Sequence, residues 1–95
     1  MHVISRKKLK QAALRYSELE PALDVWFRIT KRALWQSLSD VRETFATADG
    51  VEKWTIFNIK GNKYRLVTEI NYRFHRVYIR HVLTHAEYTR EKWKS

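Results

Sequence analysis

Two short segments carry side chains that the chemistry of an RNA backbone could use. Residues 57–66 read Phe-Asn-Ile-Lys-Gly-Asn-Lys-Tyr-Arg-Leu, and residues 84–88 read Thr-His-Ala-Glu-Tyr. The first segment has a glycine-centred turn between two runs typical of strands. Arg65 follows the turn and alternates with hydrophobic residues, so we expect its side chain on the sheet face opposite the core. This pattern predicts a phosphate-binding surface.

The charge of the chain also favours a polyanionic partner. The formal net charge is +9, and it is concentrated at the two ends. Residues 1–17 carry five Lys or Arg and no acid, and residues 60–95 carry nine Lys or Arg against three acids. Such a distribution suits nucleic acid, the ribosome, an acidic membrane or an acidic protein. The alternative is a solvated basic surface without a specific ligand.

Composition narrows the class of protein. The 95 residues, 44% of them hydrophobic, predict one folded domain, residues 1–95, with a modest core. The absence of cysteine excludes disulfides and thiolate metal sites. No run is apolar enough for a membrane span or a signal peptide, so we expect a cytoplasmic protein that does not enter a membrane. The carboxylates and histidines lack metal-ligand spacing, and we expect neither a metal nor another cofactor.

The first half of the chain is expected to be mainly helical. Residues 2–4 suit a short strand, and Ser5 can cap a helix with an apolar face. A second helix is expected from Pro21 to Leu34, with its aromatic residues in the core rather than on a base-stacking surface. Ser37 or Ser39 introduces a short third helix, and Asp49-Gly50 predicts a turn. The expected apolar positions of the three helices are Leu9, Ala12, Ala13 and Tyr16; Leu23, Trp26, Phe27, Thr30, Ala33 and Leu34; and Val41 and Phe45.

From Trp54 onward the hydrophobic period changes to two, which predicts strands. Runs 54–60, 63–72 and 74–83 would form an antiparallel meander, giving an α+β fold with two to three helices on one face. Leu66, Ile70, Val77, Ile79 and Leu83 would face the helices, and His75 and His81 share their parity, which favours semi-buried structural roles. Lys60, Lys63, Arg65, Arg76 and Arg80 would share the open face. A register slip of one residue would undo this grouping.

With these residues in view, the sequence resembles the HigB-type toxins of bacterial toxin–antitoxin systems, a branch of the RelE-like endoribonucleases. The resemblance covers nearly the whole chain, from the opening Met-His-Val-Ile-Ser-Arg-Lys through the Trp-Phe pair of the second helix. The hairpin at residues 57–66 and the segment at residues 84–88 are its most specific parts. It implies a RelE-like fold, with a short N-terminal strand added to the three-stranded meander.

The resemblance also implies an activity and partners. The activity is cleavage of messenger RNA on translating ribosomes. Because no metal is expected, we expect this cleavage to proceed by attack of the ribose 2′-hydroxyl, which gives a cyclic phosphate. The protein partner is a HigA-type antitoxin with a helix-turn-helix domain, and operator DNA is bound only through the toxin–antitoxin complex.

Residue roles follow from the resemblance together with the chemistry of RNA cleavage, which needs a base, an acid and cations at the developing charge. Arg65 matches the phosphate-stabilising arginine of RelE-like enzymes, and Lys60 and Lys63 are expected to hold the backbone. His85 is the candidate acid or base, with Glu87 as a weaker alternative base, and Tyr88 is expected to stack on a base or donate a proton. Further RNA contacts are assigned to Asn58, Asn62, Arg76 and Arg80, the two arginines by parity only.

His85 and Tyr88, the two candidate catalytic residues outside the hairpin, have structural alternatives. His85 can simply hydrogen-bond a backbone carbonyl after the last strand, and Tyr88 can close the core. Two other function classes also stay open. One is a non-catalytic RNA- or ribosome-binding module that uses the same basic surface. The other is a DNA-binding regulator, which is weakened because no pair of short helices joined by a glycine-containing turn is present.

Overall fold

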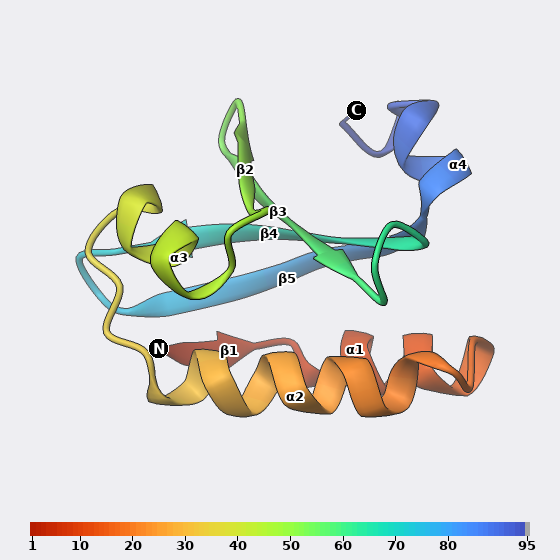
Figure 1. Cartoon of the computed structure of the whole chain (residues 1–95), viewed down its shortest axis with the longest axis horizontal. Coiled ribbons are helices and arrows are strands. Elements are labelled where there is room, and N and C mark those ends of the chain that lie inside the picture. Colours follow the sequence, from red (N-terminus) through yellow and green to blue (C-terminus); the bar gives the residue numbers. More distant parts are fainter. Residues whose placement is uncertain (95) are drawn as a thin grey trace.

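The computed structural model describes residues 1–94 and is built on a mixed five-stranded sheet with the order β1-β5-β4-β3-β2 (Figure 1). The sheet comprises β1 (His2–Ile4), β2 (Asp49–Val51), β3 (Trp54–Ile59), β4 (Tyr64–Asn71) and β5 (Arg76–Thr84). Strands β2 to β5 form an antiparallel meander, and β1 pairs in parallel with β5. The expected α+β fold with a short N-terminal strand is confirmed, and the meander has one strand more than expected.

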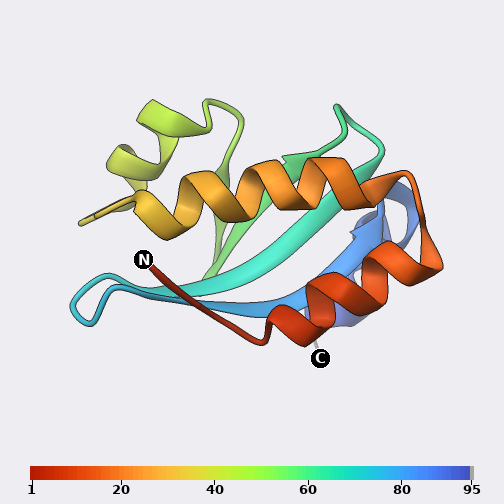
Figure 2. The ribbon, with the colours of Figure 1, turned by 90° about the horizontal axis from the view of Figure 1, so that it is seen from below.

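Helices occupy both sides of this sheet. They are α1 (Arg6–Arg15), α2 (Leu19–Arg32), α3 (Leu38–Thr44), α4 (His85–Thr89) and the 3₁₀ helix η1 (Lys92–Lys94). In Figure 1, α1 and α2 lie below the sheet, whereas α4 lies above it. Figure 2, seen from below, shows α1 and α2 side by side in front of the strands. The three helices expected from the sequence, α1 to α3, contribute Leu9, Leu23 and Val41 to one core on one side of the sheet, as expected. The additional short helix α4 lies on the other side.

The main core lies between the sheet and α2. Leu23, Trp26 and Thr30 of α2 are buried, and the Trp26 ring meets the edge of Phe57 on β3 at 5.3 Å. A buried aromatic side chain removes roughly 150–250 Å² from water, so this contact contributes much of the packing. The expectation that the α2 aromatics belong to the core is confirmed for Trp26. Leu34 is 73% exposed because α2 ends at Arg32 and Ala33 is extended, which corrects its expected place in the core.

A second hydrophobic cluster covers part of the opposite face. It contains Trp54, Ile56, Val67 and Trp93, with Tyr88 and Leu83 packed against it. Trp93 of η1 meets Trp54 of β3 edge to face at 5.0 Å. The face expected to be open is thus partly closed by the segment that follows β5.

A β-bulge changes which side chains of β5 face which side. Val67 pairs with His81 but Thr68 pairs with Ile79, so Arg80 is left as the extra residue. One inserted residue reverses the parity of everything after it. Leu83 consequently lies in the second cluster and not in the main core, and His81 lies on that same face. The parity expected for these two residues was wrong for this reason.

Two local expectations are also corrected. Asp49 and Gly50 belong to β2, and the turn falls two residues later, where Glu52 has φ 54°. A Cβ at position 50 would lie 3.0 Å from a methyl group of Leu38, so glycine allows α3 to lie close to this strand. Ser5 occupies the N-cap position of α1 with φ 76° but makes no side-chain cap, which contradicts its expected role. Ser37 does cap α3, because its Oγ accepts a hydrogen bond from the Asp40 amide.

Candidate nucleic-acid interface

The hairpin between β3 and β4 presents two lysines to solvent. Lys60 and Lys63 are both exposed, and the turn between them has left-handed backbone at Lys60 (φ 53°) and Gly61 (φ 66°). No atom of residues 1–94 lies within 4 Å of a Cβ built at Gly61, so the backbone angle and not lack of space favours glycine here. The turn holds both ammonium groups at the tip of the sheet.

Arg65 lies directly behind this turn and is only 9% exposed. Its Nη1 donates to the backbone oxygens of Asn62 (3.2 Å) and Tyr64 (3.1 Å), and its Nη2 donates to Asn62 Oδ1 (2.5 Å). The Tyr88 ring centre lies 5.6 Å from the guanidinium carbon. Arg65 pairs with Asn58 on β3 and with Leu83 on β5, so it lies on the face away from the main core, as expected.

Helix α4 brings His85 and Tyr88 to the same end of the sheet. The His85 amide donates to the Lys63 carbonyl at 2.9 Å, and the His85 side chain is exposed. Thr84 and Glu87 form a capping box, in which the Thr84 amide donates to Glu87 Oε1 at 2.9 Å. Glu87, considered as an alternative base, is thus used to start the helix.

Trp93 fixes the position of the Tyr88 ring. The two rings stack at 5.2 Å with an interplanar angle of 14°, and Trp93 Nε1 donates to the Tyr88 carbonyl at 2.9 Å. Trp93 in turn rests on Trp54 of β3. The Tyr88 ring therefore contacts both Trp93 and the guanidinium of Arg65.

The remaining predicted RNA contacts are distributed differently. Asn58 is exposed and directly opposite Arg65, and Asn62 contacts Arg65 itself. Arg76 begins β5 with its guanidinium 5.8 Å from the Phe74 ring centre, about 26 Å along the strand from the α4 end. The structure therefore brings together Lys60, Lys63, Arg65, His85 and Tyr88 with the two asparagines, and leaves Arg76 apart.

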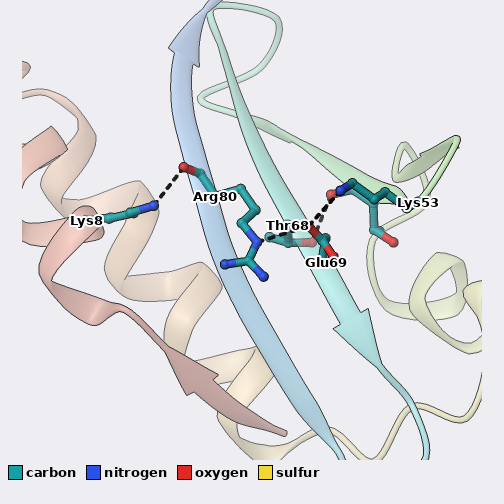
Figure 3. Close-up of polar contacts among 6 residues, drawn as sticks. Lys8, Lys53, Thr68, Glu69 and Arg80 are labelled. Carbon is teal, nitrogen blue, oxygen red and sulfur yellow. Dashed lines mark hydrogen bonds and ion pairs between the residues drawn. The ribbon is translucent and has the colours of Figure 1, made fainter. Parts of the chain in front are cut away.

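Arg80 is held by an acid. Its Nε lies 3.1 Å from Glu69 Oε1, and Lys53 reaches the same carboxylate at 3.8 Å (Figure 3). Lys8 of α1 donates to the Arg80 carbonyl at 3.2 Å, on the edge of the strand. The Glu69 carboxylate thus offsets the charge of Arg80, unlike that of Arg65.

His81 is a residue that the sequence reasoning placed on the wrong face. Its ring centre lies 6.3 Å from that of Trp93, beside the second cluster. Burial, with a smaller effect of the Lys8 charge, lowers the pKa of His81, so the imidazole is neutral at neutral pH. Nothing in the alternating pattern revealed the bulge that places it there.

A hydrogen bond not expected from the sequence ties the hairpin to the connection between α1 and α2. The Tyr64 hydroxyl donates to Glu18 Oε1 at 2.6 Å, and the Tyr64 ring lies 5.2 Å from that of Tyr16. This bond raises the pKa of Tyr64 to about 12 and lowers the pKa of Glu18, which the charges of Lys63 and Lys60 lower further. The contact holds the base of the hairpin.

Tyr64→Phe is expected to change how stability depends on alkaline pH. The pKa of Tyr64 is raised in the folded state from 10.0 to about 12, so the stabilisation is fully present below pH 10 and is lost as pH rises toward 12. The wild type should lose more unfolding free energy than Tyr64→Phe over this window, measured by denaturant unfolding at a series of pH values. Equal losses in the two proteins would show that the hydrogen bond does not form in solution.

A groove of about 660 Å³ lies between α1 and α2, away from this cluster. Its walls include Leu9, Leu14, Leu23 and Phe27, and the Arg6 guanidinium lies 4.2 Å from the Phe27 ring centre. Such apolar walls do not suit phosphate. The basic cluster at the hairpin is instead an exposed surface, which suits a polymeric ligand.

Among residues 1–94, no group of three or more histidines or acids is placed to hold a metal ion. Within the same range, every helix is too short or too polar to cross a membrane.

Comparison with known proteins decides the family. Residues 19–91 match the HigB toxin family, described as the RelE-like toxic component of a toxin–antitoxin system. The chain belongs to the HigB toxin family. The resemblance stated from the hairpin and from residues 84–88 is therefore confirmed, and so is the RelE-like fold.

Several HigB proteins are similar to this chain over most of its length. The mRNA interferase toxin HigB of Escherichia coli strain K12 is 30% identical over 91 residues, which cover 93% of this chain and 88% of the relative. The mRNA interferase HigB of Shigella flexneri has the same identity and coverage. The mRNA interferase HigB of E. coli O6:H1 is 29% identical over the same coverage. Trp93, which supports Tyr88 here, lies beyond the residues matched to the HigB family.

Proposed function

We propose that this chain is a single toxin domain that cleaves messenger RNA on the ribosome in the cytoplasm. The observation that carries the proposal is the gathering of Lys60, Lys63, Arg65, His85 and Tyr88 at one end of the sheet. The names of the relatives as mRNA interferases support it. A net charge of +9 adds long-range attraction for RNA.

The reaction is transfer of the phosphoryl group to the neighbouring ribose 2′-oxygen. The 2′-hydroxyl loses its proton and attacks phosphorus, and the 5′-oxygen of the next nucleotide leaves and takes up a proton. The product is a 2′,3′-cyclic phosphate, and no metal is needed. Arg65 stabilises the extra negative charge on the phosphoryl oxygens, because no carboxylate among residues 1–94 contacts it and offsets its charge.

The other members of the cluster bind and transfer protons. His85 is exposed beside Lys63 and serves as acid or base, since an imidazole can both donate and accept a proton. Tyr88 offers its hydroxyl for proton transfer. Trp93 stacks on its ring and the Arg65 guanidinium lies over it, so stacking on a base would require displacing one of these contacts. Lys60 and Lys63 hold the backbone, Asn58 lies close enough to contribute from β3, and Arg76 and Arg80 extend the RNA path along β5.

The partner of the toxin is a HigA-type antitoxin with a helix-turn-helix domain. Membership in the toxin–antitoxin family supports an antitoxin partner. Operator DNA is contacted through the antitoxin in the complex. A pull-down of the product of the adjacent reading frame with the tagged toxin tests this assignment.

A single 2′-deoxy nucleotide on the 5′ side of the scissile phosphate is expected to abolish cleavage at that position, because it removes the attacking hydroxyl. The assay uses purified toxin, programmed ribosomes and a short messenger RNA, with cut sites mapped by primer extension. The unmodified message should yield fragments that end in a 2′,3′-cyclic phosphate.

A 2′-deoxy nucleotide one position away from the cut site serves as the matched control and should be cleaved normally. Equal cleavage of both modified messages would rule out attack by the 2′-hydroxyl. If the toxin binds programmed ribosomes but cuts no message, the protein is a binding module and not a nuclease.

A further inference from the structure

The guanidinium of Arg65 is held by one residue at two points. Asn62 accepts a hydrogen bond from Nη1 through its backbone oxygen and one from Nη2 through its side-chain Oδ1. The Tyr64 carbonyl accepts a further bond from Nη1. Three of the five N–H groups of Arg65 are thus directed at the turn of its own hairpin.

The edge of the guanidinium that these bonds leave is the one suited to a phosphate. Nη1 and Nη2 both donate to Asn62, so the N–H groups at the end of the guanidinium are occupied. Nη1 gives its other hydrogen to Tyr64, which leaves Nε–H and one N–H of Nη2. Within residues 1–94, neither of these two donors has a protein acceptor. They lie parallel on the side of the fork, in the arrangement that binds two oxygens of one anion.

The acceptors that hold Arg65 are neutral. Its three bonds go to two peptide oxygens and one amide oxygen, so its full positive charge stays available. Arg80 offers the contrast within the same sheet, because the Glu69 carboxylate binds its Nε at 3.1 Å and offsets its charge (Figure 3). An amide at position 62 therefore orients an arginine without competing with phosphate.

We propose that Asn62 is a positioning residue, which locks Arg65 so that its Nε edge meets the scissile phosphate. This inference deepens the proposed function and rests on it. It also changes the role expected for Asn62, which acts through Arg65 and does not bind RNA directly. The Tyr88 ring, 5.6 Å from the guanidinium carbon, limits motion of the fork from a second direction.

Asn62→Ala is expected to free the guanidinium. Nitrogen-15 NMR of the Arg65 side chain, assigned by comparison with Arg65→Lys, should show separate Nη signals at low temperature in the wild type. In Asn62→Ala rotation about the Cζ–Nη bonds should average them. Cleavage should lose about 10–100-fold in kcat with little change in KM, because a misplaced group costs rate more than binding.

Asn62→Asp separates orientation from charge. The carboxylate keeps the acceptor, so the restrained Arg65 signals should remain, but it offsets the charge in the way that Glu69 does for Arg80. We expect the KM for RNA to rise about 10-fold at physiological salt, because the new carboxylate at position 62 would pair with the charge of Arg65. Asn71→Ala is the matched control, because Asn71 Oδ1 makes one turn hydrogen bond at the opposite end of β4. It should leave cleavage and the Arg65 signals unchanged.

A double-mutant cycle with Arg65→Ala completes the test. If Asn62 acts only through Arg65, adding Asn62→Ala to Arg65→Ala should cost no further activity. If Asn62→Ala lowers the activity of Arg65→Ala by as large a factor as it lowers that of the wild type, Asn62 contacts RNA itself and the inference is overturned. Unchanged Arg65 signals in Asn62→Ala would overturn it as well. The NMR result does not depend on RNA cleavage, so it stands apart from any failure of the proposed function.

Discussion

Arg65→Ala is expected to lower the rate of messenger RNA cleavage by about 10²–10³-fold, the usual effect of removing one preorganised donor at a developing charge. The reason is that three hydrogen bonds and the ring of Tyr88 hold the guanidinium of Arg65 in one orientation. Arg65→Lys should recover only part of this rate, because lysine keeps the charge but loses the fork. Single-turnover cleavage of a ribosome-bound message measures both effects.

Arg73→Ala is the matched control for the loss of one positive charge. Arg73 is exposed in the turn at the other end of β4, 5.4 Å from the Phe74 ring centre. It should cleave within a few-fold of the wild-type rate. Circular dichroism and ribosome co-sedimentation should show that Arg65→Ala stays folded and bound. Wild-type cleavage by Arg65→Ala would remove the proposed phosphate site.

Trp93→Ala is expected to destabilise the fold by about 3–5 kcal/mol, the usual cost of deleting a buried tryptophan. Trp93 is 8% exposed, packs on Trp54 and Tyr88, and closes the second cluster. Its loss also removes the support of Tyr88, so cleavage should fall in the protein that stays folded. Urea unfolding at equilibrium measures the free energy.

Leu14→Ala is the control for this substitution, since Leu14 is 87% exposed and its loss should change stability by no more than about 0.5 kcal/mol. Trp93→Phe should recover much of the packing but not the hydrogen bond from Nε1 to the Tyr88 carbonyl. Unfolding free energies equal to wild type in Trp93→Ala would mean that η1 does not pack on the sheet in solution.

The sequence alone predicted most of the architecture, because the hydrophobic periodicity of a strand or helix is a local pattern. Alternation along β3 and β4 placed Leu66 and Arg65 on opposite faces, and the apolar stripe of α2 placed Trp26 in the core. The glycine of the hairpin and the segment at residues 84–88 were specific enough to indicate the family. These features depend on neighbours within a few positions, which a sequence displays directly.

The closure of the second face was decided by tertiary structure. The sequence left open whether Tyr88 acts in the site or closes the core. Its stacking partner Trp93 packs in turn on Trp54, which precedes Trp93 by 39 positions. Alternation in β3 cannot show whether Trp54 and Ile56 are covered or exposed. Contacts between distant segments depend on how the whole chain packs, which no local pattern records.

The sequence by itself determined the family, the α+β fold and the place of Arg65 on the face away from the main core. Only the tertiary structure decided the bulge at Arg80, which moves His81 and Leu83 to the face away from the main core. It also decided the hydrogen-bond partners of Arg65 and Arg80. Asn62 leaves the charge of Arg65 available, and Glu69 offsets that of Arg80. The physical reason is that a bulge and a hydrogen-bond partner depend on pairing between strands, whereas periodicity depends on one strand alone.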